Sequence, residues 1–359
     1  MGFAVSVLLA SSAIIQTLAG PISDLIGRRP VILWSLAIFV LATIGCIYAS
    51  SVTLFMIFRA LQAIAASCMV LSRAIVRDTT EGASAASKIA YVTMGMSIVP
   101  MISPAIGGFL DAHVGWQANF WLLAITGAVI WIMSYFDQGE TAPKTDSTLG
   151  RYFKDYPTLL KSQRFWGYAL SSGLSSGAFF AYLGGAPFVG TDVFGMSPQT
   201  LGLFFSTPAV GYFAGNFISG RYSSRFGVDP MIFYGIGIAL FGLTGSMAAS
   251  LLHASNEWIF FGSMILVGLG NGMSIPNASA GMLSINPRLA GTASGLGGSI
   301  MIGLGAGLSA VAGLVLGPES TETAIVALMW VSVLLGLLCM TYVLYRKRVL
   351  SEFHKSDLS

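Results

Sequence analysis

The stretch GPISDLIGRRP places one acid and two arginines between two long apolar runs. The carboxylate of Asp24 and the guanidinium groups of Arg28 and Arg29 can form charge-assisted hydrogen bonds. Gly20 and Gly27 permit a tight turn and a close approach of helices. The alternative is an ordinary basic loop with a stray acid, which the glycine spacing disfavours. We therefore expect a charged contact at one end of two helices.

A second candidate lies inside an apolar run. Arg59, the second residue of FRALQAIAAS, falls in the middle of this run, where a cation costs about 3 kcal/mol unless it faces a cavity or a partner. Gln62 follows three residues later, on the same helix face, and can hydrogen-bond a ligand or orient the guanidinium. The alternative role for Arg59 is to fasten helices through backbone carbonyls. The spacing favours a functional pair.

Other reactive residue types are scattered. None of the acids lies deep in an apolar run, and His113, His253 and His354 lie in loops or the tail. The three cysteines (Cys46, Cys68 and Cys339) sit within apolar runs, so we expect neither disulfides nor a metal site. Without a spaced acid pair or a nucleophile–base pair, the sequence argues against an enzyme and predicts no cofactor.

These residues must be positioned by membrane-spanning helices. Of the 359 residues, 55% are hydrophobic and 9% charged, with a mean hydropathy of +0.77. Apolar runs of roughly 20 residues are long enough to cross a bilayer. We count eleven spans, near residues 3–23, 31–50, 53–73, 88–110, 119–137, 164–187, 199–220, 230–252, 257–281, 291–315 and 323–345. The predicted class is an all-α integral membrane protein.

The basic residues predict the orientation. All Lys and Arg except Arg59 fall in loops on one side, whereas the opposite loops hold only acids. By the positive-inside rule the basic side and the C-terminus are cytoplasmic.

An internal repeat divides the chain. At an offset of 200 residues, Gly20, Gly27 and Pro30 coincide with Gly220, Gly227 and Pro230. Parallel halves of this kind are a transporter architecture with a site between them. The predicted domains are a five-span bundle (1–137), a linker (138–163), a six-span bundle (164–345) and a basic tail (346–359). Because the partner of the second half's first span would precede Met1, we expect a truncated or misassigned start that lacks the first helix.

The opening stretch resembles the loop between the second and third helices of the major facilitator superfamily, G-x-x-x-D-x-x-G-R-[RK]. FRALQAIAAS resembles the R-x-x-Q-G motif of its drug/proton antiporters, with Ala63 in place of glycine. SPAIGGFL is similar to the antiporter motif G-P-x-x-G-G, with Ser103 in place of its first glycine and with Pro104, Gly107 and Gly108 present. IPNASA and AGTASGLGGS are similar to the tenth and eleventh helices of Bcr/CflA-type drug-resistance efflux transporters.

The resemblance implies the major facilitator fold, with two pseudo-symmetric helix bundles that expose a central site alternately to each face. It also implies export of small amphipathic drugs or antibiotics in exchange for protons. The implied location is a bacterial inner membrane, and the implied oligomeric state is a monomer. The implied partners are the drug, protons and the lipid bilayer, and no nucleic acid. Arg59 and Gln62 would serve coupling and substrate binding, with Tyr182 and Asn277 lining the cavity. Gly20, Asp24, Gly27, Arg28 and Arg29 would form the cytoplasmic gate, and Pro104, Gly107 and Gly108 would seal the cavity.

Four alternatives to these expectations stay open. One is a proton-coupled transporter of a specific metabolite, such as a sugar or an amino acid. Another is a truncated remnant without coupling, because the family's proton-carrying carboxylate usually lies on the first helix. For Tyr182, Asn277 and the other polar residues within spans, helix packing is as good an explanation as cavity lining. An integral-membrane enzyme is the least supported.

Overall fold

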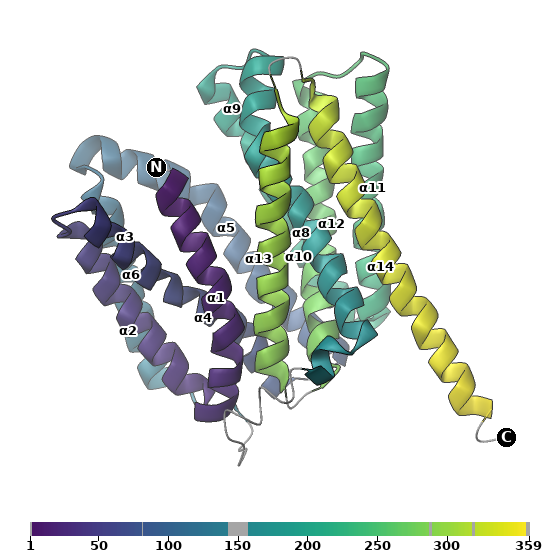
Figure 1. The fold of residues 1–359 in the computed structure, drawn as a ribbon, viewed down its shortest axis with the longest axis horizontal. Coiled ribbons are helices and arrows are strands. Elements are labelled where there is room, and N and C mark those ends of the chain that lie inside the picture. Colours follow the sequence, from purple (N-terminus) through teal and green to yellow (C-terminus); the bar gives the residue numbers. More distant parts are fainter. Residues whose placement is uncertain (1, 81, 143–156, 287–288, 318–319, 357–359) are drawn as a thin grey trace. The chain divides into compact units, whose positions relative to one another are not determined.

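The computed structural model describes residues 2–80, 82–142, 157–286, 289–317 and 320–356. Within these ranges the chain is built of helices joined by short connections, with no strand (Figure 1). The prediction of an all-α fold is confirmed.

The helices follow the predicted spans closely. Those of the first half are α1 (Gly2–Ile26), α2 (Arg28–Ile47), α3 (Val52–Gln62), α4 (Ala66–Thr79), α5 (Gly82–Val114) and α6 (Gln117–Asp137). Those of the second half are α8 (Gln163–Phe188), α9 (Pro198–Phe205), α10 (Thr207–Phe226), α11 (Val228–Leu251), α12 (Glu257–Leu283), α13 (Ala290–Val315) and α14 (Glu322–Ser356). Each of the eleven predicted spans overlaps one helix or a consecutive pair. Within the described residues, eight helical segments are long and apolar enough to cross a membrane.

Local sequence explains where several helices begin. The side chains of Ser51, Ser162 and Asn256 each accept a hydrogen bond from a backbone N–H in the first turn of the helix that follows. Such caps satisfy N–H groups that have no partner inside the helix. Gly27 (φ 102°) separates α1 from α2, and Gly227 (φ 90°) separates α10 from α11. Because few other residues adopt positive φ, the repeat of 200 residues places the same turn in both halves.

One compact unit, here unit 1, comprises residues 1–80, 102–159 and 286–299. In it, α2 packs against α3 and α6, and α1 packs against α3 and α4. Val31, Ile32, Leu36 and Leu71 form its buried core. The start of α13 belongs to this unit, which brings residues from the far end of the sequence beside α1.

A second compact unit, here unit 2, comprises residues 81–101, 160–285 and 300–359. Its central helix is α12, which packs against α8, α10 and α11, while α8 also packs against α14. A Cβ added at Gly272 of α12 would overlap the carbonyl oxygen of Tyr212, so α10 and α12 lie in direct backbone contact. Small residues permit such close packing in membrane helices.

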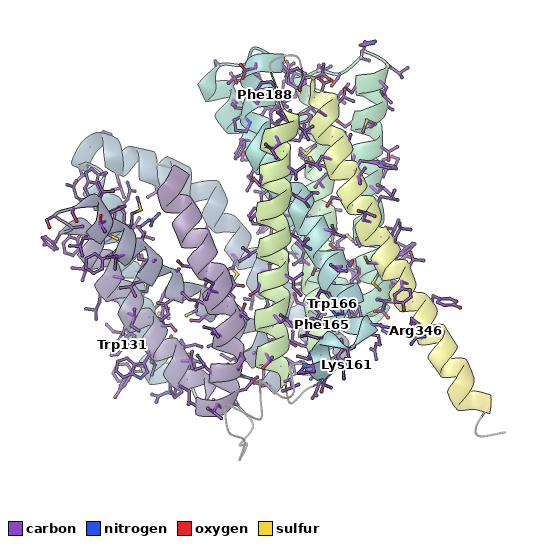
Figure 2. All side chains as sticks on the ribbon, in the orientation of Figure 1. Trp131, Lys161, Phe165, Trp166, Phe188 and Arg346 are labelled. Carbon is purple, nitrogen blue, oxygen red and sulfur yellow. The ribbon has the colours of Figure 1, made fainter. Side chains whose placement is uncertain are left out.

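The outer surfaces of both units carry many apolar side chains (Figure 2). Trp34, Phe136, Phe241 and Leu314 are each at least 70% exposed. Such surfaces suit a lipid environment. Part of the predicted linker, residues 143–156, lies outside the described residues, and the division at residues 137 and 164 stays a prediction. In the predicted tail, α14 continues as a helix to Ser356.

Candidate functional site

The loop between α1 and α2 is a sharp reversal at one residue. Helix α1 ends at Ile26, Gly27 adopts φ 102°, and α2 begins at Arg28. A Cβ at Gly27 would overlap the carboxylate of Glu140. Glycine at this position therefore serves both the turn and the approach of an acid from the segment after α6.

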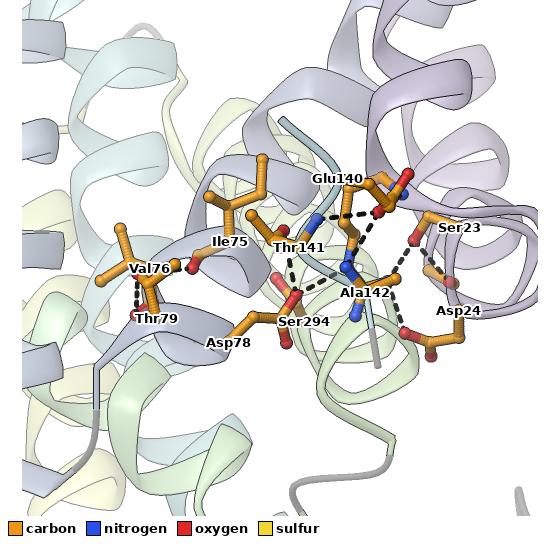
Figure 3. Close-up of polar contacts among 12 residues, drawn as sticks. Ser23, Asp24, Ile75, Val76, Asp78, Thr79, Glu140, Thr141, Ala142 and Ser294 are labelled. Carbon is orange, nitrogen blue, oxygen red and sulfur yellow. Dashed lines mark hydrogen bonds and ion pairs between the residues drawn. The ribbon is translucent and has the colours of Figure 1, made fainter. Parts of the chain in front are cut away.

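Arg28 is the buried centre of a group that we call the Arg28 cluster: Asp24, Arg28, Asp78, Glu140 and Thr292. Figure 3 shows Asp24, Asp78 and Glu140 of this group. Its Nη1 lies 2.5 Å from Oδ1 of Asp24, and its Nε lies 3.0 Å from Oδ2 of Asp78. The Arg28 residue is 1% exposed. A guanidinium this deeply buried needs such partners, because removing one carboxylate would leave charge uncompensated.

Asp24 connects this group to the first turn of α13. Its Oδ2 accepts hydrogen bonds from the backbone N–H and the hydroxyl of Thr292, each at 3.0 Å. The positive end of a helix dipole favours a carboxylate here. A Cβ at Gly291 would overlap Asp24, and a Cβ at Gly20 would overlap the carbonyl of Gly291. Gly20, which was predicted to belong to the gate, is thus a point where the backbone of α1 contacts the backbone of α13.

Glu140 holds the other side of the turn. Its carboxylate accepts four backbone N–H groups, from Arg28 (2.8 Å), Arg29 (3.2 Å), Thr141 (2.9 Å) and Ala142 (2.8 Å). Burial acts to raise the pKa of Glu140, but these hydrogen bonds outweigh it and lower the pKa below its usual range. Glu140 therefore stays ionised and caps the start of α2.

The Arg29 side chain points to the same segment rather than to an acid. Its Nε donates to the carbonyl of Gln138 and its Nη2 to the carbonyl of Tyr135, both at 2.8 Å. The guanidinium also lies 5.5 Å from the centre of the Tyr135 ring. Arg29 thus fastens the end of α6 to α2.

Arg59 and Gln62 form the predicted pair on α3. Nη1 of Arg59 donates to Oε1 of Gln62 at 2.9 Å, and Nε2 of Gln62 donates to the hydroxyl of Thr43 at 2.8 Å. The guanidinium lies 5.7 Å from the centre of the Phe120 ring. Its Nε is buried and has no hydrogen-bond partner among the described residues. The α-helical geometry ends at Gln62, where a 3₁₀ turn, Ala63–Ala65, begins.

The other predicted binding residues lie in unit 2 and are fully buried. The Tyr182 hydroxyl donates to the carbonyl of Phe205 at 3.1 Å, and the two rings stack. The Asn277 amide donates to Ser219 and to the carbonyl of Met273, both at 2.7 Å. The Tyr182–Phe205 and Asn277–Ser219 contacts each join two helices, whereas the Asn277–Met273 contact lies within α12. The Asn277 Oδ1 is buried without a hydrogen-bond partner among the described residues.

The predicted antiporter motif lies within α5. The backbone carbonyl of Gly107 accepts a hydrogen bond from Asn119 Nδ2 at 3.3 Å. The side-chain surroundings of Pro104 and Gly108 lie outside the described part of the chain.

Four residues that complete these contacts were not predicted: Thr43, Asp78, Glu140 and Thr292. Asp78 and Glu140 could have been found as acids placed among the basic residues of the same loops. Thr43 and Thr292 carry no comparable signal. In the described residues, no group of three His, Cys, Asp or Glu side chains could hold a metal ion. The arrangement is suited to fastening helices and to presenting the guanidinium of Arg59, rather than to bond-breaking chemistry.

Comparison with known proteins agrees with this geometry. Residues 1–310 and 194–356 match the family described as Major Facilitator Superfamily. The chain is 30% identical over 335 residues to Multidrug resistance protein D of Escherichia coli (strain K12), covering 92% of this chain and 83% of that protein. It is 30% identical over 344 residues to the Chloramphenicol resistance protein of Pseudomonas aeruginosa, covering 91% and 78%.

The fold also matches a solved structure of a transporter. The E. coli fucose:proton symporter superposes with a TM-score of 0.79 at 12% identity, covering 95% of this chain and 91% of that one. At this identity the likeness concerns the fold alone. The chain belongs to the Major Facilitator Superfamily and is a multi-pass membrane transporter of small molecules rather than an enzyme.

Proposed function

We propose that this transporter exports small amphipathic drugs from the cytoplasm across a bacterial inner membrane in exchange for protons. The observation that carries the proposal is the Arg59–Gln62 pair, a hydrogen-bonded cation and amide in an apolar helix. The drug class is supported by the two resistance proteins, to which the chain is similar along most of its length.

Arg59 and Gln62 are the proposed coupling and binding residues. The contacts of Arg59 leave its Nε without a partner in the described structure, so the guanidinium has a donor to offer a substrate or a carboxylate. Because Gln62 is anchored by Thr43, it can keep the guanidinium in one orientation. Tyr182 and Asn277 are proposed to contribute to the cavity, where the Asn277 oxygen is a free acceptor within the described residues.

The Arg28 cluster is the proposed cytoplasmic gate, together with Gly20, Gly27 and Arg29. Asp24 joins α1 to the start of α13 through Thr292, and Arg28 holds Asp24 in place. An alternating-access cycle requires contacts that form in one state and break in another. Charged hydrogen bonds at helix ends meet this need better than interdigitated apolar side chains. Pro104, Gly107 and Gly108 are proposed to shape α5 and prevent leak.

The proposal is tested in proteoliposomes that contain the purified full-length chain, a pH-sensitive dye and a proton gradient. Chloramphenicol is a suitable first probe, together with cationic dyes. We expect each transported drug to accelerate dissipation of the gradient and to accumulate against its own gradient. Sugars and amino acids are added as competitors. Drug movement without proton flux would contradict coupling, and competition by a metabolite with no drug flux would favour the metabolite alternative.

A further inference from the structure

A shallow apolar groove lies between α8 and α14 in unit 2. Its lining is mostly apolar or aromatic and comprises Trp166, Gly167, Leu170, Leu338, Cys339 and Tyr342. Leu338 and Tyr342 are 55% and 44% exposed, so the groove opens to the surroundings of the protein. Gly167 has no side chain, and a Cβ there would overlap Val343 of α14, so the floor of the groove lies close to the helix contact.

The groove has an apolar part and a polar end. Leu170, Leu338 and Cys339 lie deeper along the helices, while Gln163, Trp166 and Tyr342 lie nearer the start of α8. The Tyr342 hydroxyl donates to Gln163 at 3.0 Å, and the Trp166 indole N–H donates to the carbonyl of Leu160 at 2.7 Å. Trp and Tyr are typical of the membrane–water boundary. The polar end therefore lies at headgroup depth.

Two cations flank this polar end. Lys161 precedes Gln163 by two residues, and Arg346 follows Tyr342 by one helical turn. Figure 2 shows Lys161 and Arg346 at the same end of α8 and α14 as Trp166. Among the described residues, neither Lys161 nor Arg346 has an acid partner, whereas the nearby Lys347 is paired with Asp229. The groove thus ends in a net positive charge.

We propose that this groove binds one anionic phospholipid. An acyl chain fits along Leu170, Leu338 and Cys339, and the headgroup phosphate lies against Lys161 and Arg346. The apolar lining selects a chain rather than a soluble phosphate, and the unpaired cations select an anionic headgroup over a zwitterionic one. A bound lipid would hold the extended end of α14 against α8.

The test measures lipid binding to the purified full-length protein by native mass spectrometry. Phosphatidylglycerol and phosphatidylcholine with the same acyl chains are titrated after delipidation. We expect the first bound lipid to be phosphatidylglycerol with at least a fivefold preference. In the double variant Lys161→Gln/Arg346→Gln, affinity for phosphatidylglycerol should fall about thirtyfold, since each of the two cations contributes about 1 kcal/mol at an anionic surface. Affinity for phosphatidylcholine should change less than twofold.

Three further variants make the result specific. Arg221→Gln/Arg225→Gln removes the same charge from α10, which does not line the groove, and should keep the preference. Cys339→Phe fills the apolar part of the groove and should weaken the binding of both phosphatidylglycerol and phosphatidylcholine. Lys161→Arg/Arg346→Lys keeps both positive charges and should bind phosphatidylglycerol as tightly as the wild type. The proposal is overturned if wild type shows no preference, or if the α10 pair loses as much preference as the groove pair.

Discussion

Arg59 shows how one side chain can be costly to the fold and still be retained. Its position in an apolar helix carries a penalty of about 3 kcal/mol, which Gln62, Thr43 and Phe120 offset only in part. A guanidinium with a spare donor in this environment is better explained by a transported species than by packing. The residue is therefore the sharpest place to test the proposed coupling.

Replacement of Arg59 by lysine should weaken coupling while keeping the charge. Lysine lacks the planar fork that reaches Gln62 and presents a second donor. Losing one charge-assisted hydrogen bond of about 1.5–3 kcal/mol predicts a ten- to hundredfold fall in drug-driven proton flux in proteoliposomes. The control, Thr43→Val, removes only the anchor of Gln62 and should reduce flux less. Wild-type flux in Arg59→Lys would contradict the role assigned to this residue.

Glu140 should make stability depend on pH through the α1–α2 turn. Because its folded pKa is lowered, its contribution is complete above the unfolded pKa of about 4.3 and is lost as the pH falls through the folded value. Glu140→Gln should therefore lower the melting temperature at pH 7, by an amount equivalent to about 1 kcal/mol or less. Thermal unfolding in detergent checks this.

The difference in melting temperature between Glu140→Gln and the wild type should narrow as the pH falls below about 4.3 and through the lowered folded pKa. Glu257→Gln is a suitable comparison, because it removes one carboxylate from the first turn of another helix, α12. A difference that does not narrow as the pH falls from about 5 to about 3 would show that the Glu140 charge is irrelevant to the turn.

Helices α10, α11 and α12 are packed through backbone rather than through large side chains. Cβ atoms at Gly215 and Gly272 would overlap the facing helix, and so would a Cβ at Gly235. In lipid, where apolar burial gives little drive for association, such contacts and their dispersion energy hold helices together. The glycines of these helices are thus unequal, although the sequence shows them as one abundant residue type.

Two glycines on α12 should separate these roles. Gly272→Ala places a methyl group against the backbone of Tyr212 and Asn216 and should destabilise unit 2 by about 1–3 kcal/mol. At Gly262 nothing lies within 4 Å of an added Cβ, so Gly262→Ala should be neutral or stabilising by up to about 1 kcal/mol. Melting temperatures of the two variants in the same detergent provide the comparison. Equal shifts would exclude close packing as the reason for glycine at position 272.

The helices themselves could be predicted because the length of an apolar run reports a span directly. The offset of 200 residues added the matching turns at Gly27 and Gly227. The breaks inside spans could not be predicted in this way. The apolar run continues through Ala63–Ala65 after Gln62, so the change to a 3₁₀ turn leaves no mark in the pattern. The same holds for the break between α9 and α10.

Only part of the candidate site could be predicted. Asp24 and Arg28 are four residues apart, so their contact is visible in the local sequence. Asp78, Glu140 and Thr292 come from segments about 50, 110 and 270 residues away, and nothing in their own spacing indicates that they meet Arg28 or Asp24. Arg59 could be predicted by its cost alone, whereas its anchor Thr43 depends on how α2 packs on α3.

The predicted orientation of the whole molecule in the membrane rests on the distribution of charge and can be measured on one helix. Helix α12 has 27 residues, about 40 Å at 1.5 Å per residue, which is enough to cross the hydrocarbon layer. Ala254 lies just before it, in a loop without Lys or Arg, and Ser284 lies just after it, near Arg288. In a background in which Cys46, Cys68 and Cys339 are changed to alanine, Ala254 and Ser284 are replaced by cysteine in two separate variants. A membrane-impermeant thiol reagent should label Ala254→Cys in intact cells and Ser284→Cys only after permeabilisation. The opposite pattern would reverse the proposed direction of transport. Labelling of both variants in intact cells would show that α12 does not cross the membrane.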